Sequence, residues 1–481
     1  MRRRRSQEEL DGLDFSTAEE IKKLSSLSFT PQKRRPKQSK ITKNTVLYSH
    51  AHSYPSSILK IKTDESVNPH SPNVYVLAGT IDVLIEILTH PLGKDQDFET
   101  TFIMSSDGFL SPRELFERII QRWEGGSVTI RENIIEFFKI WLKKRKDVLE
   151  DDQTLKKDFL EWVDQMDITG LDEMKSTGFK IFIKTQLEGK NVSSQFNADV
   201  SKTEEMLHAE YLEGAPESYP ILDFSLNLEY DLLSFHPEEL ARQLTLYDAD
   251  LLKRIKPHEW LKKGWMSGKS KNITQFIDRF NLVSNWVSSM IVLGPTKSFR
   301  ALLIGRFICV GMHCLLLNNY NSVLEIVSGM TSTACSRLLQ TWQEVEPGMM
   351  RSLERLKELV SPANKFKALK EAQEAAEGPT IPYLGLYLND LTLIEDGNPD
   401  VTNEELINFD KYTMVAQTIL KSEDFKNKLM YRLYPVEEIQ IWLKEHLLVL
   451  SEDDMFEESL QRESRELNSL LKAKLGKKAN I

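Results

Sequence analysis

The sequence predicts an all-α protein in which a small helical domain precedes a larger helical domain. Three observations support this fold class. Apolar residues recur at helical spacing through two long regions, 72–190 and 226–475. Several of these stretches begin with residues that cap helices. Apart from short ambiguous runs such as 60–62, no stretch alternates apolar and polar residues in the way a half-buried strand does.

The first 70 residues are polar and mixed in charge, and we expect them to form a disordered basic arm. Residues 1–45 hold twelve Lys/Arg and six Asp/Glu, although the whole chain carries a net charge of −10. The run 33–43 has six cations and no acid, which is typical of a solvated tail. Weak contact with anionic membranes, at about 1 kcal/mol per cation, is the alternative. The rest of the chain carries a negative net charge, which argues against nucleic-acid binding.

Region 72–190 predicts a small unit made of helices. Ser111 and Glu114 form a capping box, and Pro112 occupies the first helical position, where its missing N–H costs nothing. The other helices follow from apolar residues at helical spacing. The predicted helices are 77–90, one that begins at Ser111, 130–146 and 154–166.

A linker is predicted at 191–225, around one short helix, and the chain is helical again over 226–475. The stretch 301–317 is apolar nearly all round, which indicates a helix buried at the centre of a sizeable domain. Polar interruptions leave it short of the apolar length of a membrane span. No repeat with a period of 20–50 residues is present in the sequence.

The motifs of covalent catalysis and of metal binding are missing from this sequence. The three cysteines have neither disulfide nor metal spacing, which predicts a cytoplasmic protein with reduced thiols. The stretch 294–298 only partly resembles a phosphate-binding loop, because no glycine precedes Lys297. We therefore expect that this protein does not make or break covalent bonds, and that it uses no cofactor and no metal.

The stretch 380–420 predicts two helices joined by a short polar turn. The first is apolar at helical spacing and ends in acidic residues, and Gly397 and Pro399 then stop it. Thr402 and Glu405 form a capping box that predicts the start of the second helix at once. Taken alone, this pattern predicts a helical hairpin that is packed in the hydrophobic core.

This hairpin and three other blocks, in the same order, resemble the catalytic domain of guanine-nucleotide exchange factors for Ras-family GTPases. The other blocks are 237–261, 273–291 and 306–342. Region 72–190 more loosely resembles the Ras exchanger motif domain, also called the N-terminal RasGEF domain, which precedes the catalytic domain in that family. Residues 102–109 depart from the usual aromatic, Thr-rich segment. The resemblance implies an N-terminal domain at 72–190 that braces the hairpin, and a catalytic domain at 226–475.

The resemblance implies a partner, a Ras-like small GTPase, from which this protein would promote GDP release so that GTP can load. Exchange factors of this kind work by contacts alone, with a protruding hairpin as a wedge. The resemblance implies that the wedge residues of this protein are Thr392, Leu393 and Asp396. The family usually has leucine at the position of Thr392 and glutamate at the position of Asp396. Without the family, the acidic residues would be a solvated helix end.

The pocket that receives the GTPase carries over to Leu324, Thr331, Phe366 and Tyr383. Thr331 stands where many members have asparagine, and a hydroxyl cannot make both hydrogen bonds of an amide. Phe366 replaces a frequent tyrosine and lacks its hydroxyl. We expect residues 318–321 to break the chain between two helices and to have a structural role.

Two alternatives remain open from the sequence. The three departures at Thr331, Thr392 and Asp396 suit a scaffold of the same fold that binds a GTPase but no longer drives exchange. An unrelated helical adaptor is the second alternative, favoured if 383–420 lay flat in the core. The sequence does not distinguish Ras, Rap or Ral as the target.

Overall fold

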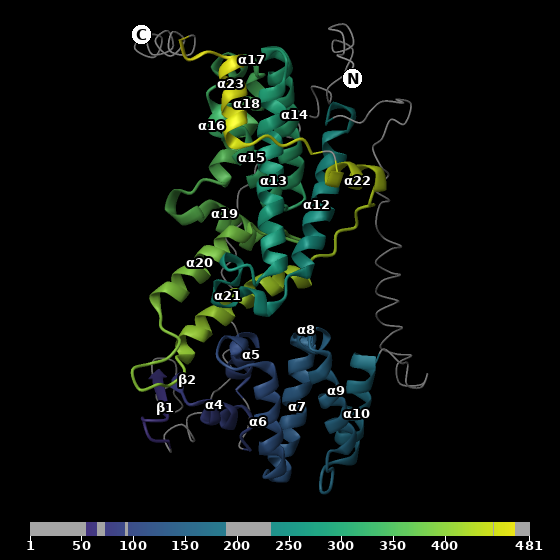
Figure 1. Cartoon of the computed structure of the whole chain (residues 1–481), viewed down its shortest axis with the longest axis vertical. Coiled ribbons are helices and arrows are strands. Elements are labelled where there is room, and N and C mark those ends of the chain that lie inside the picture. The colour runs from purple at the N-terminus through teal and green to yellow at the C-terminus, as the bar shows by residue number, and fades with distance from the viewer. Residues whose placement is uncertain (1–53, 65–72, 92–94, 189–231, 446, 467–481) are drawn as a thin grey trace.

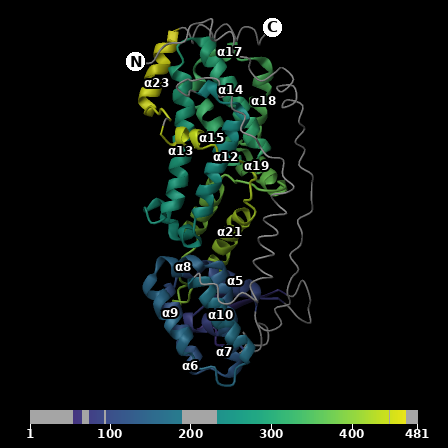
Figure 2. The ribbon, with the colours of Figure 1, turned by 90° about the vertical axis from the view of Figure 1, so that its right-hand side faces the viewer.

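The computed structural model describes residues 54–64, 73–91, 95–188, 232–445 and 447–466. In these residues helices dominate and one two-stranded sheet is present, so the predicted all-α fold class is confirmed. Figures 1 and 2 show an elongated molecule with the N-terminal domain at one end and the larger domain at the other. The predicted linker 191–225 and the basic run 33–43 lie outside the described residues.

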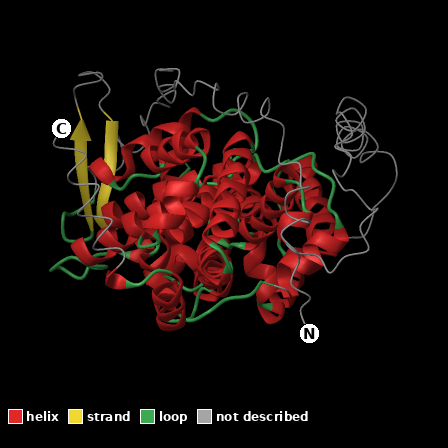
Figure 3. Ribbon diagram, turned by 90° about the horizontal axis from the view of Figure 1, so that it is seen from above, coloured by secondary structure: helices red, strands yellow, loops and turns green. Residues whose placement is uncertain are grey.

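The N-terminal domain packs its helices beside a small antiparallel sheet, which stands at one edge of the molecule when seen from above (Figure 3). Three of its α-helices, α5, α8 and α10, were not predicted. The elements are β1 (Leu59–Asp64), β2 (Asn73–Gly79), α4 (Ile81–Leu88), α5 (Gln96–Ser105), η1 (Ser106–Gly108), α6 (Pro112–Glu124), α7 (Val128–Lys144), α8 (Lys146–Asp151), α9 (Gln153–Gln165) and α10 (Glu173–Glu188).

Strand β1 lies inside the stretch that was predicted to be disordered, so that arm was predicted too long. Its sequence is the ambiguous run LKIKTD, in which the apolar Leu59 and Ile61 alternate with lysines. The alternation covers only its first four residues, because Thr63 and Asp64 are both polar, and so short a run is ambiguous by pattern alone. Pairing with β2, in which Leu59 lies opposite Gly79, is what orders the segment.

The larger C-terminal domain consists of helices. Its centre is α14, which is apolar and long enough to cross a membrane, yet 72% of its apolar window is buried in the protein, as in a core helix. The elements are η2 (Leu232–Ser234), α12 (Pro237–Arg254), η3 (Pro257–Met266), α13 (Lys271–Leu293), α14 (Lys297–Leu316), α15 (Tyr320–Thr331), α16 (Thr333–Ser336), α17 (Leu339–Glu344), α18 (Pro347–Leu359), α19 (Ala363–Ala375), α20 (Leu384–Gly397), α21 (Phe409–Asn427), α22 (Glu437–Glu445) and α23 (Glu452–Arg462).

Of the two predicted capping boxes, one lies at the start of a helix and the other does not. The Ser111 hydroxyl accepts the backbone N–H of Glu114 at 3.2 Å, as predicted for the start of α6. The prediction at Thr402 is wrong, since α21 begins only after the N-cap Asn408. The backbone of Ile407 instead pairs with Gly79 of β2, at 2.9 and 3.2 Å. The neighbouring domain therefore holds this stretch extended, which a local pattern cannot indicate.

The described residues form two hydrophobic cores, and these do not coincide with the two domains. One core is built from α13–α15, α18 and their neighbours in the C-terminal domain. The other fills the N-terminal domain and continues into the C-terminal domain through η3, α20 and α21, with Trp260, Leu391 and Ile419 fully buried in it. The hairpin therefore shares its core with the N-terminal domain.

Candidate functional site

Helices α20 and α21 form a hairpin that extends from the C-terminal domain towards the N-terminal domain (Figure 1). Leu388 and Leu391 lie on its buried side. Leu393 lies on the opposite side and is 61% exposed. The hairpin therefore protrudes and presents one free side, unlike the flat packing that would favour an unrelated adaptor.

The structure places all three predicted wedge residues in the last turns of α20, but in different surroundings. Leu393 and Asp396 are exposed and lie three residues apart, which puts them on neighbouring positions of one helix face. The Thr392 hydroxyl is half-buried and donates to the Leu388 carbonyl at 2.7 Å, so its hydrogen bond is made within the helix. Of the three predicted wedge residues, Leu393 and Asp396 are thus the two that are exposed on α20.

Only part of the acidic helix end is solvated. The Glu395 carboxylate is 8% exposed and lies 2.5 Å from the ammonium of Lys411, which also contacts Asp400 at 2.6 Å. Burial alone would lower the pKa of Lys411, but hydrogen bonds to Asp400 and Glu395 outweigh it and raise that pKa. Lys411 is therefore a permanent cation that joins α21 to the end of α20. Sequence reasoning missed it because only the turn of the hairpin brings it to Glu395 on α20 and to Asp400 in the loop after α20.

The N-terminal domain braces the hairpin through aromatic contacts. The ring of Phe98 stacks on Phe409 with centroids 4.7 Å apart, and Phe109 packs against Tyr412 at 4.8 Å. The Tyr412 hydroxyl donates to the Gly108 carbonyl at 2.9 Å. Burial raises the pKa of Tyr412 well above its usual range, so this hydroxyl keeps its proton. The predicted bracing role thus has a physical basis at the start of α21.

Three aromatic side chains gather at the base of the hairpin. Tyr383, the N-cap of α20, lies 6.1 Å from Phe366 and 5.6 Å from Phe280 between ring centroids. All three are half-buried against the core that contains Leu324, which is 8% exposed. Thr331 is exposed two helical turns beyond Leu324, and its hydroxyl donates to the Val327 carbonyl at 2.7 Å.

Three of the four predicted pocket residues thus share one core, and Thr331 stands at its edge. Phe280 was not predicted as part of the pocket. It follows Phe276 by one turn of α13 and precedes Val287 by two turns, so the helical spacing of these apolar residues was the available signal.

A buried polar network fixes α15, the helix that carries Leu324. The Ser322 hydroxyl lies 2.7 Å from Asp248 and 3.1 Å from Glu325, and both carboxyl groups are fully buried. Asn319 donates to Asp248 at 3.1 Å, which supports the structural role expected for 318–321. The break between the helices is shorter than expected, because α15 already begins at Tyr320. Burial raises the pKa of Asp248, and burial together with the charge of Asp248 raises the pKa of Glu325. Both carboxyl groups are therefore harder to ionise than in water, because burial disfavours their charged forms.

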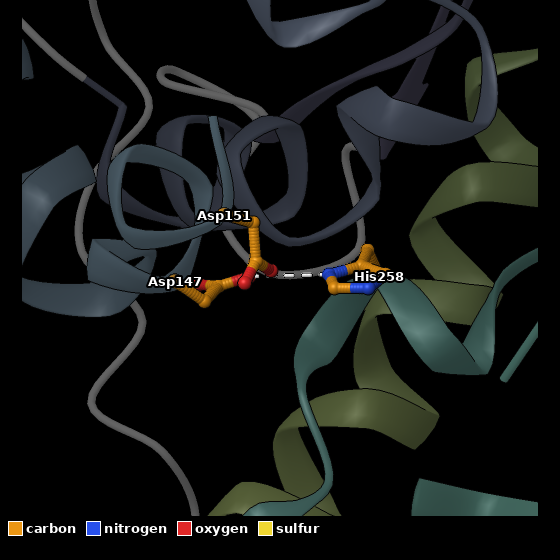
Figure 4. Close-up of side chains that lie close together, drawn as sticks. All are labelled: Asp147, Asp151 and His258. Carbon is orange, nitrogen blue, oxygen red and sulfur yellow. Dashed lines mark hydrogen bonds and ion pairs between the residues drawn. The ribbon is translucent and has the colours of Figure 1, made fainter. Parts of the chain in front are cut away.

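Asp147, Asp151 and His258 form a cluster that could hold a metal ion, with one ligand atom from each within 4.8 Å of the others (Figure 4). The two carboxylates already have cationic partners. Arg145, fully buried, contacts Asp147 at 3.2 Å, and Lys256 contacts Asp151 at 2.5 Å. The His258 ring nitrogen lies 3.2 Å from Asp147. We assign these contacts to an ionic junction between α8 and η3, and thus between the two domains.

Comparison with known proteins identifies both regions. The RasGEF N-terminal motif matches residues 75–162 and the RasGEF domain matches residues 239–413. Ras guanine nucleotide exchange factor A of Dictyostelium discoideum is 30% identical over 433 residues, which cover 84% of this chain and 68% of that protein. Ras-specific guanine nucleotide-releasing factor 1 of Mus musculus is 36% identical over 230 residues, which cover 47% of this chain and 18% of that protein.

Ras guanine nucleotide exchange factor I of Dictyostelium discoideum is 30% identical over 409 residues, which cover 81% of this chain. This chain spans about half the length of that protein and of exchange factor J, at 47% and 49%. The RasGEF domain match includes the pocket residues and all of α20, and the N-terminal match includes the residues that brace the hairpin. The chain belongs to the family of Ras guanine nucleotide exchange factors.

Proposed function

We propose that this protein binds a Ras-like small GTPase, promotes release of GDP from it and so allows GTP to load. The observation that carries the proposal is the protruding hairpin, whose free side presents Leu393 and Asp396 while its other side is held by the N-terminal domain. A wedge must be both exposed and rigid, and this hairpin has both properties.

The wedge residues act on the nucleotide site without any change in covalent bonds. Leu393 displaces the GTPase segment that covers the Mg²⁺ side of the site. The Asp396 carboxylate opposes the phosphates and accepts hydrogen bonds from the amides that they leave. Such contacts accelerate release because they are made only with the opened GTPase. Lowering the activation free energy of release by about 1.4 kcal/mol makes release tenfold faster. The cellular ratio of GTP to GDP sets the direction.

The aromatic pocket supplies the binding surface beside the wedge. Phe280, Phe366 and Tyr383 present half-buried rings that pack against the core to which the buried Leu324 belongs. Half-buried aromatic groups of this kind are typical anchoring sites for an apolar side chain of a partner. Thr331 lies at the edge, and its hydroxyl donates a hydrogen bond within α15. It therefore contributes to the shape of the binding surface more than to hydrogen bonds with the partner.

The test is a nucleotide-release assay. GTPases of the Ras, Rap and Ral types are loaded with a fluorescent GDP and mixed with the purified protein and excess unlabelled GTP. We expect faster loss of fluorescence for at least one type, in proportion to the protein concentration. Release at the spontaneous rate from all three types would overturn the proposal.

A scaffold of the same fold is the second candidate function. The departures at Thr331, Thr392 and Asp396 favour it, as does the engagement of the Thr392 hydroxyl within its own helix. Capture of a nucleotide-free GTPase by the protein, without faster release in the assay above, would establish this scaffold role in place of exchange.

We also propose a cytoplasmic location with recruitment to anionic membranes through residues 33–43. The support is the sequence of that run, with six cations and no acid. Co-sedimentation with phosphatidylserine vesicles should exceed that with phosphatidylcholine vesicles, and it should fall when the six cations are changed to glutamine. Equal binding to both kinds of vesicle would exclude this route.

A further inference from the structure

We propose that Lys262 and Lys263 of η3 are positioning residues that hold the end of α20, and with it the wedge carboxylate of Asp396. The inference rests on the proposed function and adds to it two residues that lie outside the hairpin. It is carried by the contacts of both lysines, by their backbone conformation, and by the attachment of η3 to the N-terminal domain.

Three acidic residues at the hairpin end each have a contact with these lysines. The Lys263 ammonium pairs with the Asp396 carboxylate. The backbone N–H of Lys262 donates to Glu395 at 3.1 Å, and the Lys262 ammonium lies 3.5 Å from Asp400. The two lysines therefore span the last turn of α20 and the loop that follows it.

The backbone of both lysines is in the left-handed region, which favours glycine. Their φ angles are both 51°, with ψ of 33° for Lys262 and 39° for Lys263. A residue with a side chain costs about 1–2 kcal/mol in this region. Such strain persists where the surroundings over-determine the conformation, and it is concentrated at functional sites. Here the conformation directs the Lys262 N–H at Glu395.

The other end of η3 is fixed to the N-terminal domain. Lys256 contacts Asp151 at 2.5 Å. His258 lies 3.2 Å from Asp147, as Figure 4 shows. Between the two ends, Trp260 is fully buried in the core shared by both domains. The segment η3 is thus anchored on one domain and contacts the wedge of the other, so it can transmit rigidity to Asp396.

Asp396 needs such support for two reasons. It stands in the last turn of α20, where the partial negative charge of the helix end repels a carboxylate and attracts a cation. It is also exposed, so that no packing fixes its rotamer. The Lys263 ammonium compensates the repulsion and restricts the side chain to one place. Loss of that ammonium should leave Asp396 present but poorly placed.

The experiment measures GDP release from the GTPase that responds best to the unaltered protein. The test variants are Lys263→Gln, which removes the charge, and Lys263→Gly, which also relieves the backbone strain. Lys263→Arg restores a cation. Lys357→Gln is the matched control, because the pair Lys357–Glu354 has side-chain exposures of 35% and 58%, against 31% and 59% for Lys263–Asp396, and lies on α18.

We expect Lys263→Gln and Lys263→Gly to lower kcat for release by roughly two- to fivefold, the range set by an exposed ion pair, with KM for the GTPase little changed. Lys263→Arg should restore most of the rate, and Lys357→Gln should match the unaltered protein. The melting temperature of Lys263→Gly should stay equal or rise, because glycine prefers this backbone region. A purely structural role would instead make activity follow stability.

The inference is overturned if the unaltered protein accelerates release and both Lys263 variants do so equally well. A faster rate in these variants would also overturn it, since the ion pair would then hold Asp396 back from the GTPase instead of positioning it. Absence of acceleration by the unaltered protein is a different result, because it defeats the proposed function itself.

Discussion

Leu393 and Asp396 are exposed to solvent in the free protein, whereas neighbouring leucines of α20 are buried. Leu393 keeps 61% of its side chain in contact with water, although leucines in α20 such as Leu391 are fully buried. Burying an exposed leucine in a partner gains roughly 1.5–3 kcal/mol. An exposed apolar side chain that does not stabilise its own fold is therefore available for a partner.

We predict that Leu393→Ala and Asp396→Asn each slow GDP release by roughly tenfold, which corresponds to about 1.4 kcal/mol of lost transition-state contact. Neither change should lower the melting temperature, because neither side chain is buried. Release kinetics and thermal unfolding measure the two effects. The control is Ile441→Ala on α22, an exposed apolar residue away from the hairpin, which should leave release unchanged. Full activity in both hairpin variants would show that the wedge lies elsewhere.

The buried carboxyl pair of Asp248 and Glu325 should make stability depend on pH. The folded-state pKa of Glu325 lies above its usual value of 4.5, so the folded protein binds more protons than the unfolded chain above that pH. Stability should therefore fall as pH rises from about 4.5, by at most roughly 1.4 kcal/mol per pH unit while one group titrates.

Glu325→Gln tests this pair, because an amide resembles the protonated acid and can donate to the Ser322 hydroxyl. We predict that the variant is at least as stable as the unaltered protein at pH 7.5, and that its melting temperature changes less between pH 5 and pH 8. Calorimetry at several pH values provides the measurement. A large loss of stability at pH 7.5 would mean that Glu325 is charged in the folded protein.

The residues that could be identified from sequence are those whose signal is local or belongs to the family. Leu393 and Asp396 lie on a recognisable amphipathic helix with a clear stop. Lys411 and Lys263 could not be identified, since the turn of the hairpin is what brings Lys411 to Glu395 and Asp400, and 133 positions separate Lys263 from Asp396. An exposed lysine and one that holds a buried carboxylate look alike in a sequence.

At the scale of elements, helix starts could be predicted where the chain itself satisfies the backbone. Ser111 caps α6 with its own hydroxyl, and nothing outside the segment is needed. The loop between α20 and α21 contains an equally good capping box at Thr402, yet Ile407 forms its backbone hydrogen bonds with Gly79 of the sheet. Tertiary pairing therefore overrides the local signal, and the ordered strand β1 was missed for the same reason.

Tyr412 tests whether the brace at the start of α21 matters for exchange. Tyr412→Phe removes the hydroxyl that donates to the Gly108 carbonyl at 2.9 Å and also contacts Asp400 at 3.2 Å, and it should cost about 1 kcal/mol of stability. We predict a lower rate of GDP release as well, because the hairpin becomes less rigid while Leu393 and Asp396 stay intact. The control is Tyr431→Phe, which removes a hydroxyl that donates to the Leu317 carbonyl at 2.7 Å within the C-terminal domain. Equal release rates in the two variants would exclude a special role for the brace.

At the scale of the whole molecule, the boundary between cooperative units differs from the boundary between domains. The sequence divides the chain where linker composition occurs, at 191–225. The hydrophobic contacts divide it instead between the core of α13–α15 and the core that joins the N-terminal domain to the hairpin. Residues that share a core tend to open together, in cooperative units that hydrogen exchange can resolve. The hairpin should therefore open with the N-terminal domain.

Two matched substitutions test this arrangement. Ile135→Val on α7 and Ile326→Val on α15 each remove one methyl group from a buried isoleucine, at a cost of roughly 0.5–1.5 kcal/mol. In hydrogen–deuterium exchange, we predict that Ile135→Val lowers the protection of α7 and of the distant α20 and α21 by similar amounts, and leaves α14 and α15 protected. Ile326→Val should do the reverse. If the hairpin amides respond only to Ile326→Val, the hairpin belongs energetically to the C-terminal domain, and the N-terminal domain cannot control the wedge through the shared core.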